Sequence, residues 1–95
     1  MEKGWYVVHT YSGYEQKIER IINKLRESDE EFKQYCTGVS VPFESVTVIN
    51  EKGEKKVEQK KVLPGYILVE LDLPEDSWRT TTAKIARIQG VTGFL

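Results

Sequence analysis

The order of hydrophobic and polar positions predicts a small α+β domain. Residues 5–10 are mostly aromatic or β-branched, which favours a strand in the middle of a sheet. Alternation along that strand places Trp5, Val7 and His9 on one face and the residues between them on the other. Isoleucine or leucine at positions 18, 21, 22 and 25 has helical spacing, so we predict a helix that packs one face on the sheet.

The flanking residues set the predicted bounds of this helix. Ser12 and Glu15 have the spacing of a capping box, in which each side chain accepts from a backbone N–H at the helix start. The acidic residues of segment 27–31 oppose the dipole at a helix C-terminus. We therefore predict that the helix ends near Arg26 and that a solvated loop follows.

The middle of the chain predicts a strand over residues 38–42 and then a polar hairpin. Residues 46–49 read as its first strand, and the Asn-Glu-Lys-Gly sequence at 50–53 reads as a turn. Residues 51–61 contain five lysines, three glutamates and the single apolar residue Val57, so the hairpin should project into water. Its lysines have two interpretations: they protect a strand edge from pairing, or they follow the phosphates of a nucleic acid.

A Pro-Gly corner at residues 64–65 leads into an apolar strand over residues 66–71. Proline fixes its own φ and glycine reaches conformations closed to other residues, so Tyr66 leaves the corner in a defined direction. Tyr66 and Leu68 share one face, opposite Ile67 and Val69. Either these side chains fill a core, or Tyr66 is presented to a partner.

The last third predicts a second helix and a final strand. Asp72 and Glu75 have cap-like spacing before a stretch in which Trp78, Ile85 and Ile88 share a helical face. The three threonines at 80–82 either bond to their own helical turn or offer hydroxyls to a partner. Gly90 should end the helix, and residues 91–95 form a strand. Two helices on one face of a mainly antiparallel sheet would leave the other face open.

Composition limits the functional classes. Ninety-five residues with 39% hydrophobic content suit one domain, and 15 acidic against 14 basic residues give no general attraction to nucleic acid. No apolar run approaches a membrane span and no signal peptide is evident, so we expect a cytoplasmic protein. The lone Cys36 and the lone His9 provide too few ligands for a zinc site, and we expect no metal and no cofactor.

Four segments in the same order resemble the N-terminal (NGN) domain of the NusG/Spt5 family of transcription elongation factors. These are residues 5–15, the Val41-Pro42 pair, the Leu-Pro-Gly-Tyr-Ile-Leu-Val segment 63–69 and the Gly-Val-Thr-Gly-Phe segment 90–94. The resemblance implies that residues 1–95 form a polymerase-binding domain with a four-stranded, ferredoxin- or RNP-like sheet and a projecting hairpin. It also implies that the last helix of the family domain and the C-terminal KOW barrel lie outside these residues.

The resemblance further implies a factor without enzymatic activity that docks on the clamp helices of the largest RNA polymerase subunit. Such a factor modulates pausing, processivity, termination and antitermination, and acts as a monomer. Its Rho and ribosomal protein S10 contacts belong to the KOW barrel. By position, the resemblance assigns clamp-helix binding to His9, Leu63, Tyr66 and Leu68. It places Tyr11 at the rim, towards upstream DNA, and gives Thr80, Thr81 and Thr82 a contact with the opposite polymerase lobe or the non-template strand.

Two other functional classes compete with this interpretation. A single-stranded nucleic-acid or RNA-binding module would use aromatic residues of an open sheet face for base stacking. A small enzyme would need a nucleophile and a base, for which His9, Ser12 and Cys36 are the candidates. No carboxylate at a suitable spacing joins these three, so we expect Cys36 to be a small core residue.

Overall fold

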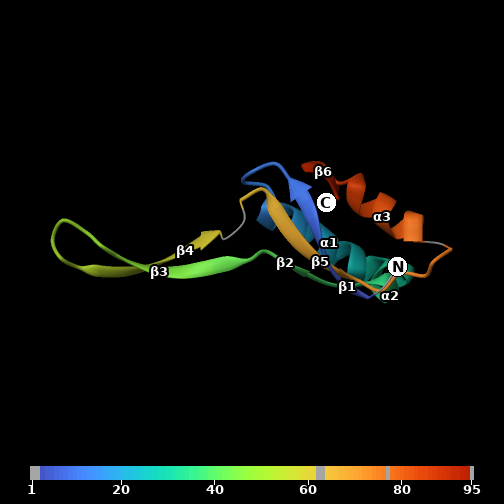
Figure 1. Ribbon diagram of the computed structural model, residues 1–95, viewed down its shortest axis with the longest axis horizontal. Helices are drawn as coiled ribbons and strands as arrows, with labels where there is room; N and C mark the ends of the chain where they lie inside the picture. The colour runs from blue at the N-terminus through green and yellow to red at the C-terminus, as the bar shows by residue number, and fades with distance from the viewer. Residues whose placement is uncertain (1–2, 62–63, 77, 95) are drawn as a thin grey trace.

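The computed structural model describes residues 3–61, 64–76 and 78–94, and it consists of a body and a projecting hairpin (Figure 1). The body contains a four-stranded antiparallel sheet with strand order β2-β5-β1-β6. Its strands are β1 (Gly4–Thr10), β2 (Cys36–Ser40), β5 (Tyr66–Leu71) and β6 (Val91–Phe94). Its helices are α1 (Glu15–Ser28), α2 (Glu30–Tyr35) and α3 (Trp78–Ala86). The predicted α+β class and the antiparallel sheet are confirmed.

One face of the sheet is buried under the helices. Val8 and Thr10 of β1 and Ile67, Val69 and Leu71 of β5 point into the core, as the alternation of these strands predicts. The helices contribute their own buried residues to the same cluster, which are Ile18 and Ile22 of α1, Phe32 of α2 and Ile85 of α3. The predicted apolar stripe of the first helix is therefore confirmed, and the core lies on one side of the sheet only.

The predicted loop after Arg26 is wrong, because the chain remains helical there, although the acidic residues Glu27, Glu30 and Glu31 are exposed to solvent as expected. Helix α1 continues to Ser28, and α2 begins directly after Asp29. The Asp29 side chain accepts a hydrogen bond from Phe32 N at 3.1 Å, which caps α2 and directs the buried Phe32 ring into the core. Burial of the Phe32 ring thus favours a helix at this point, although the glutamates beside it are polar.

Asp29 also ties this corner to α3. Its second carboxylate oxygen lies 2.7 Å from Lys84 Nζ. The hydrogen bond from Lys84, followed by the one from the Phe32 N–H, holds the pKa of Asp29 below its usual value. Because the folded-state pKa is lowered, this contribution to stability is present above the unfolded pKa and disappears as the pH falls through the folded value.

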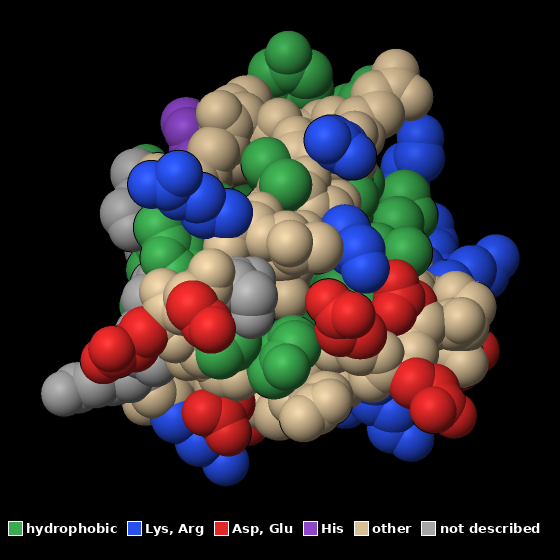
Figure 2. Space-filling view, turned by 90° about the vertical axis from the view of Figure 1, so that its right-hand side faces the viewer, with side chains coloured by type: hydrophobic (Ala, Val, Ile, Leu, Met, Phe, Trp, Pro, Cys, Tyr) green, Lys and Arg blue, Asp and Glu red, His purple; other side chains and the backbone are tan. Residues whose placement is uncertain are grey.

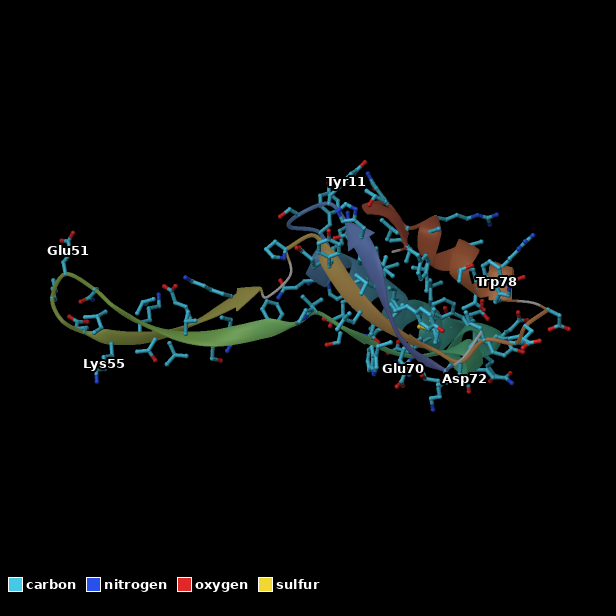
Figure 3. The ribbon with its side chains drawn as sticks, viewed as in Figure 1. Tyr11, Glu51, Lys55, Glu70, Asp72 and Trp78 are labelled. Atoms are coloured by element: carbon cyan, nitrogen blue, oxygen red, sulfur yellow. The ribbon has the colours of Figure 1, made fainter. Side chains whose placement is uncertain are left out.

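The polar hairpin is confirmed and extends away from the body. Its strands β3 (Phe43–Ile49) and β4 (Lys55–Lys61) form a separate two-stranded sheet. Asn50 Oδ1 accepts from Lys52 N and Glu54 N, both at 2.9 Å, and so shapes the turn. The molecule is 59 Å long but only 25 Å by 22 Å across, and Glu51 and Lys55 lie near the far tip (Figure 3).

The cap predicted at Asp72 is wrong. Helix α3 begins at Trp78, and Asp72 lies in the irregular segment after β5, where its backbone N–H donates to Tyr35 O at 2.8 Å. This hydrogen bond therefore fixes the end of β5 to the last residue of α2 before the chain continues to α3.

Cys36 is buried, as expected of a core residue, and burial raises the pKa of its thiol.

Candidate functional site

The face of the sheet opposite the helices carries a strip of partly exposed side chains. Three antiparallel pairs between the central strands β1 and β5 form it: Trp5 with Glu70, Val7 with Leu68, and His9 with Tyr66. We call this surface the open face. Among the predicted site residues it brings together His9, Tyr66 and Leu68, whereas Leu63 lies outside the described residues.

His9 and Tyr66 form a stacked aromatic pair at one end of the open face. Their ring centroids are 4.9 Å apart and the ring planes differ by 22°. Tyr66 is half-buried while His9 is exposed, so the pair presents ring surface to solvent. Stacking restricts both side chains before any partner arrives, which lowers the conformational entropy lost on binding.

The Pro-Gly corner is packed against the end of β1, next to this pair. Gly65 has φ +81° and its carbonyl oxygen accepts from Thr10 N at 2.7 Å. A Cβ on Gly65 would lie 3.2 Å from the Thr10 carbonyl oxygen and 3.9 Å from the His9 ring. Both the backbone conformation and the close approach therefore favour glycine at this position.

The predicted capping box at Ser12 and Glu15 does not form. Tyr14 precedes the first helical residue, and Ser12 lies exposed in the turn. Glu15 is fully buried, and its carboxylate accepts from Gly13 N at 2.8 Å and from Gly65 N at 2.7 Å. A residue predicted to cap its own helix thus reaches the Pro-Gly corner, a role that local spacing does not reveal.

Tyr11 lies just beyond the end of β1, at the edge of the body (Figure 3). It is 58% exposed, and its ring packs edge-on against Tyr14 with centroids 5.7 Å apart. Its backbone N–H donates to Gly90 O at 2.8 Å, which anchors the turn. Tyr11 is therefore a held but accessible aromatic side chain next to the open face.

Trp5 occupies the other end of the open face. It is 52% exposed, and its six-membered ring covers Gly38 of β2, where an added Cβ would lie 3.3 Å from the ring. Beside it, Glu70 accepts a hydrogen bond from the Thr37 hydroxyl at 2.7 Å. The strip thus runs from an indole and a carboxylate at one end, through Val7 and Leu68, to the aromatic pair.

The three threonines of α3 lie in three different environments, on the helical side of the sheet. Thr81 is 1% exposed, one helical turn before the buried Ile85, so the expected partner contact by Thr81 is contradicted by its burial. Thr82 Oγ1 donates within its own helix, towards Trp78 O and Arg79 O at 3.2 Å. Thr80 is exposed. Trp78, at the start of this helix, lies at the opposite end of the body from Tyr11 (Figure 3).

Charge is mixed on the end of the body remote from the hairpin, where Lys and Arg side chains alternate with Asp and Glu (Figure 2). This intermingling provides no extended field of one sign to attract a polyanion. Over the described residues, no helix combines the length and the apolar character needed to cross a membrane.

Comparisons of sequence place the chain among bacterial transcription factors. A family model described as transcription termination factor nusG matches residues 3–95. The chain is 41% identical over 95 residues to the transcription termination/antitermination protein NusG of Treponema pallidum, covering 100% of this chain and 51% of that protein. The NusG proteins of Borreliella burgdorferi and Bacillus subtilis are 44% and 48% identical, each with all of this chain and 50% of the relative covered. The chain thus spans about half the length of these relatives.

Comparison of structures agrees. A structure described as "Domain interaction in Thermotoga maritima NusG" is similar to this one with a TM-score of 0.67 and 26% identity. The match covers 100% of this chain and 46% of that one. With the family model matched from residue 3 to residue 95, the chain belongs to the NusG family of transcription termination and antitermination factors, whose N-terminal domain it resembles in sequence and fold.

Proposed function

We propose that this domain binds the clamp helices of the largest RNA polymerase subunit through the open face. The observation that carries the proposal is the apolar strip on the helix-free side of the sheet, in which Val7 and Leu68 adjoin the stacked His9 and Tyr66. Aromatic side chains with a polar tip are common anchors of protein interfaces. Because the chain belongs to the NusG family, a helical pair of the polymerase is the partner that this surface would accept.

Docking alone would not alter transcription. A factor shifts a movable clamp towards its closed state only by binding that state more tightly than the open one. The domain therefore needs contacts beyond the clamp helices. Tyr11 would meet upstream DNA at the rim, and Thr80 of α3 would meet the opposite lobe or the non-template strand; both side chains are exposed, which supports these contacts. Thr82 would contribute less to this contact, because its hydroxyl already donates to a backbone carbonyl of its own helix.

Residues 1–95 would then act as a monomeric, cytoplasmic polymerase-binding domain that modulates pausing and processivity without catalysis. Rho and ribosomal protein S10 would be partners of a C-terminal KOW barrel outside these residues. The lysines of the hairpin add at most a weak contact with DNA, because Glu51, Glu54 and Glu58 offset most of their charge.

Binding to core RNA polymerase tests the proposal. We expect saturable binding to the intact enzyme, measured by pull-down and by fluorescence anisotropy of the labelled chain. A polymerase in which the tip of the clamp helices is replaced by a short linker serves as the control, and binding to it should be lost. Equal binding to both enzymes would show that the open face meets some other part of the polymerase.

The Thr80→Ala variant should dock normally but alter pausing less than the wild-type chain does. Thr80 is exposed and lies on the side of the body opposite the open face, so removal of its hydroxyl and methyl groups leaves the open face intact. Pause lifetimes in a single-round transcription assay provide the measurement. The Thr81→Val variant, which changes the buried neighbour of Thr80, is the matched control. If wild type and Thr80→Ala gave identical pause lifetimes, the bridging contact would be excluded.

A second candidate function rests on the exposed rings of the open face. Trp5 and the His9–Tyr66 pair lie on a four-stranded sheet, an arrangement that some RNA-binding domains use to stack bases. Glu70 lies on the same face beside Trp5 and disfavours a nearby phosphate backbone. If RNA were the main ligand, affinity for free single-stranded RNA would be readily measured and would fall steeply with salt. We expect little affinity for free RNA.

A further inference from the structure

The backbone of Gly65 is held through both its N–H and its carbonyl oxygen by segments far away in the sequence. Its N–H donates to Glu15 Oε2 at 2.7 Å, and its carbonyl oxygen accepts from Thr10 N at 2.7 Å. The first bond comes from the start of α1 and the second from the end of β1. Both backbone polar groups of Gly65, which belong to the peptides before and after it, therefore fix the corner that immediately precedes Tyr66.

Glu15 is an unusual residue at this position. It lies on the core-facing side of α1, one turn before Ile18, and both residues are fully buried. Burying a carboxylate is unfavourable unless hydrogen bonds compensate for the lost hydration. Glu15 obtains them from Gly13 N at 2.8 Å and from Gly65 N, one for each oxygen. Hydrogen bonds from backbone amides to a charged acceptor are among the stronger kinds in proteins.

The position of Gly65 affects the open face through Tyr66, the next residue. Tyr66 follows Gly65 directly, pairs with His9 across the sheet and stacks on its ring. The close approach of Gly65 to the Thr10 carbonyl and the His9 ring leaves little room for the corner to shift without moving this stack. We propose that Glu15 is a positioning residue, whose buried carboxylate holds the Pro-Gly corner so that Tyr66 and His9 are stacked before the partner binds.

The proposal rests on the proposed polymerase contact for its functional consequence, but its structural part can be tested without polymerase. The Glu15→Gln variant keeps the volume of the side chain and loses one acceptor, because an amide has one carbonyl oxygen and an NH2 group that only donates. Because Gly13 N and Gly65 N donate to different oxygens of Glu15, replacing one oxygen by NH2 leaves one of the two backbone amides facing a donor. Ser12→Ala, an exposed change in the same turn, is the matched control.

Two NMR measurements on the 95-residue chain provide the first test. In the wild type and in Ser12→Ala, we expect slow hydrogen exchange of the Gly65 amide and contacts between the His9 and Tyr66 rings. In Glu15→Gln, exchange of the Gly65 amide should be about tenfold faster and the ring contacts should weaken, while core amides such as that of Val69 keep their protection. Glu15→Ala should enlarge both changes. Unchanged Gly65 exchange and ring contacts in the folded Glu15→Gln variant would overturn the proposal.

Affinity for core RNA polymerase provides the second test. We expect Glu15→Gln to bind about tenfold more weakly than wild type, and Ser12→Ala to bind as wild type does. If the wild-type chain did not bind polymerase, the proposed function would fail, whereas the NMR result would still decide the role of Glu15. If Glu15→Gln and Glu15→Ala both unfolded, the carboxylate would support the whole fold rather than the corner, and the positioning role would be excluded.

Discussion

We expect the Tyr66→Ala variant to bind core RNA polymerase about 30-fold more weakly than the wild-type chain while keeping its fold. Removal of an aromatic anchor from a protein interface typically weakens the binding free energy by about 2 kcal/mol or more, which corresponds to that factor. Tyr66 lies on the open face, whereas the residues of β5 that fill the core are Ile67, Val69 and Leu71. Fluorescence anisotropy measures the affinity, and circular dichroism with a thermal melt measures the fold.

A neighbouring substitution separates contact from stability. Ile67 is the next residue of the same strand but points into the core, where it is fully buried. Ile67→Val should lower the free energy of unfolding by about 1 kcal/mol and leave the affinity for polymerase unchanged. If Tyr66→Ala lost its dichroism spectrum, or if both variants lost affinity equally, Tyr66 would be a structural residue and the proposed contact would fail.

The parts of the fold that the sequence predicts well are those governed by a short repeat. Along β1 and β5, successive side chains point to opposite faces of the sheet, and Val8, Ile67 and Val69 are buried together on one of them. The same alternation groups His9, Tyr66 and Leu68 on the other face, but the two strands carry apolar residues on both faces, so the repeat does not indicate which face is buried. Their assignment as site residues comes from the resemblance to the NusG/Spt5 family. The Asn50–Gly53 turn of the hairpin is similarly local, because Asn50 bonds residues two and four positions ahead.

The predictions that failed depend on partners distant in the sequence. Ser12 and Glu15 match a capping box, but the Glu15 carboxylate bonds Gly65, which local spacing cannot indicate. The acidic segment 27–31 predicted a loop, but Asp29 caps α2 and its carboxylate lies 2.7 Å from Lys84 Nζ of α3. In both cases a charged side chain is committed to a bond between elements, and the polar character of the residue gave the opposite expectation.

Two further features of the fold follow from spacings that are visible in the sequence. Phe32 follows Asp29 by three residues, which is the spacing of an N-cap before a buried aromatic residue, and it marks α2. Thr81 precedes Ile85 by four residues, so both lie on the same side of α3, and Thr81 is buried with it. Helical phase therefore separates Thr81 from the exposed Thr80.

Gly90 is the position at which a single methyl group should be most damaging to the fold. Its φ is +102°, and a Cβ there would lie 2.6 Å from Tyr14 Cδ2 and 3.3 Å from Ile18 Cδ1. The Tyr14 ring adjoins the start of α1 and Ile18 belongs to the core, so neither can move without disturbing the packing. The Gly90 carbonyl also accepts from Tyr11 N, which links this turn to the rim of the open face.

We therefore expect Gly90→Ala to lower the free energy of unfolding by about 3 kcal/mol, combining backbone strain with overpacking. A domain of this size has roughly 5–10 kcal/mol in total, so the midpoint of thermal unfolding should fall by more than about 10 °C. Gly13→Ala is the matched control, since Gly13 has a similar φ of +92° but nothing within 4 Å of an added Cβ. It should lose only the strain, about 1 kcal/mol. Equal losses in the two variants, measured by urea unfolding, would mean that Tyr14 yields freely and that the close approach to Gly90 does not constrain the fold.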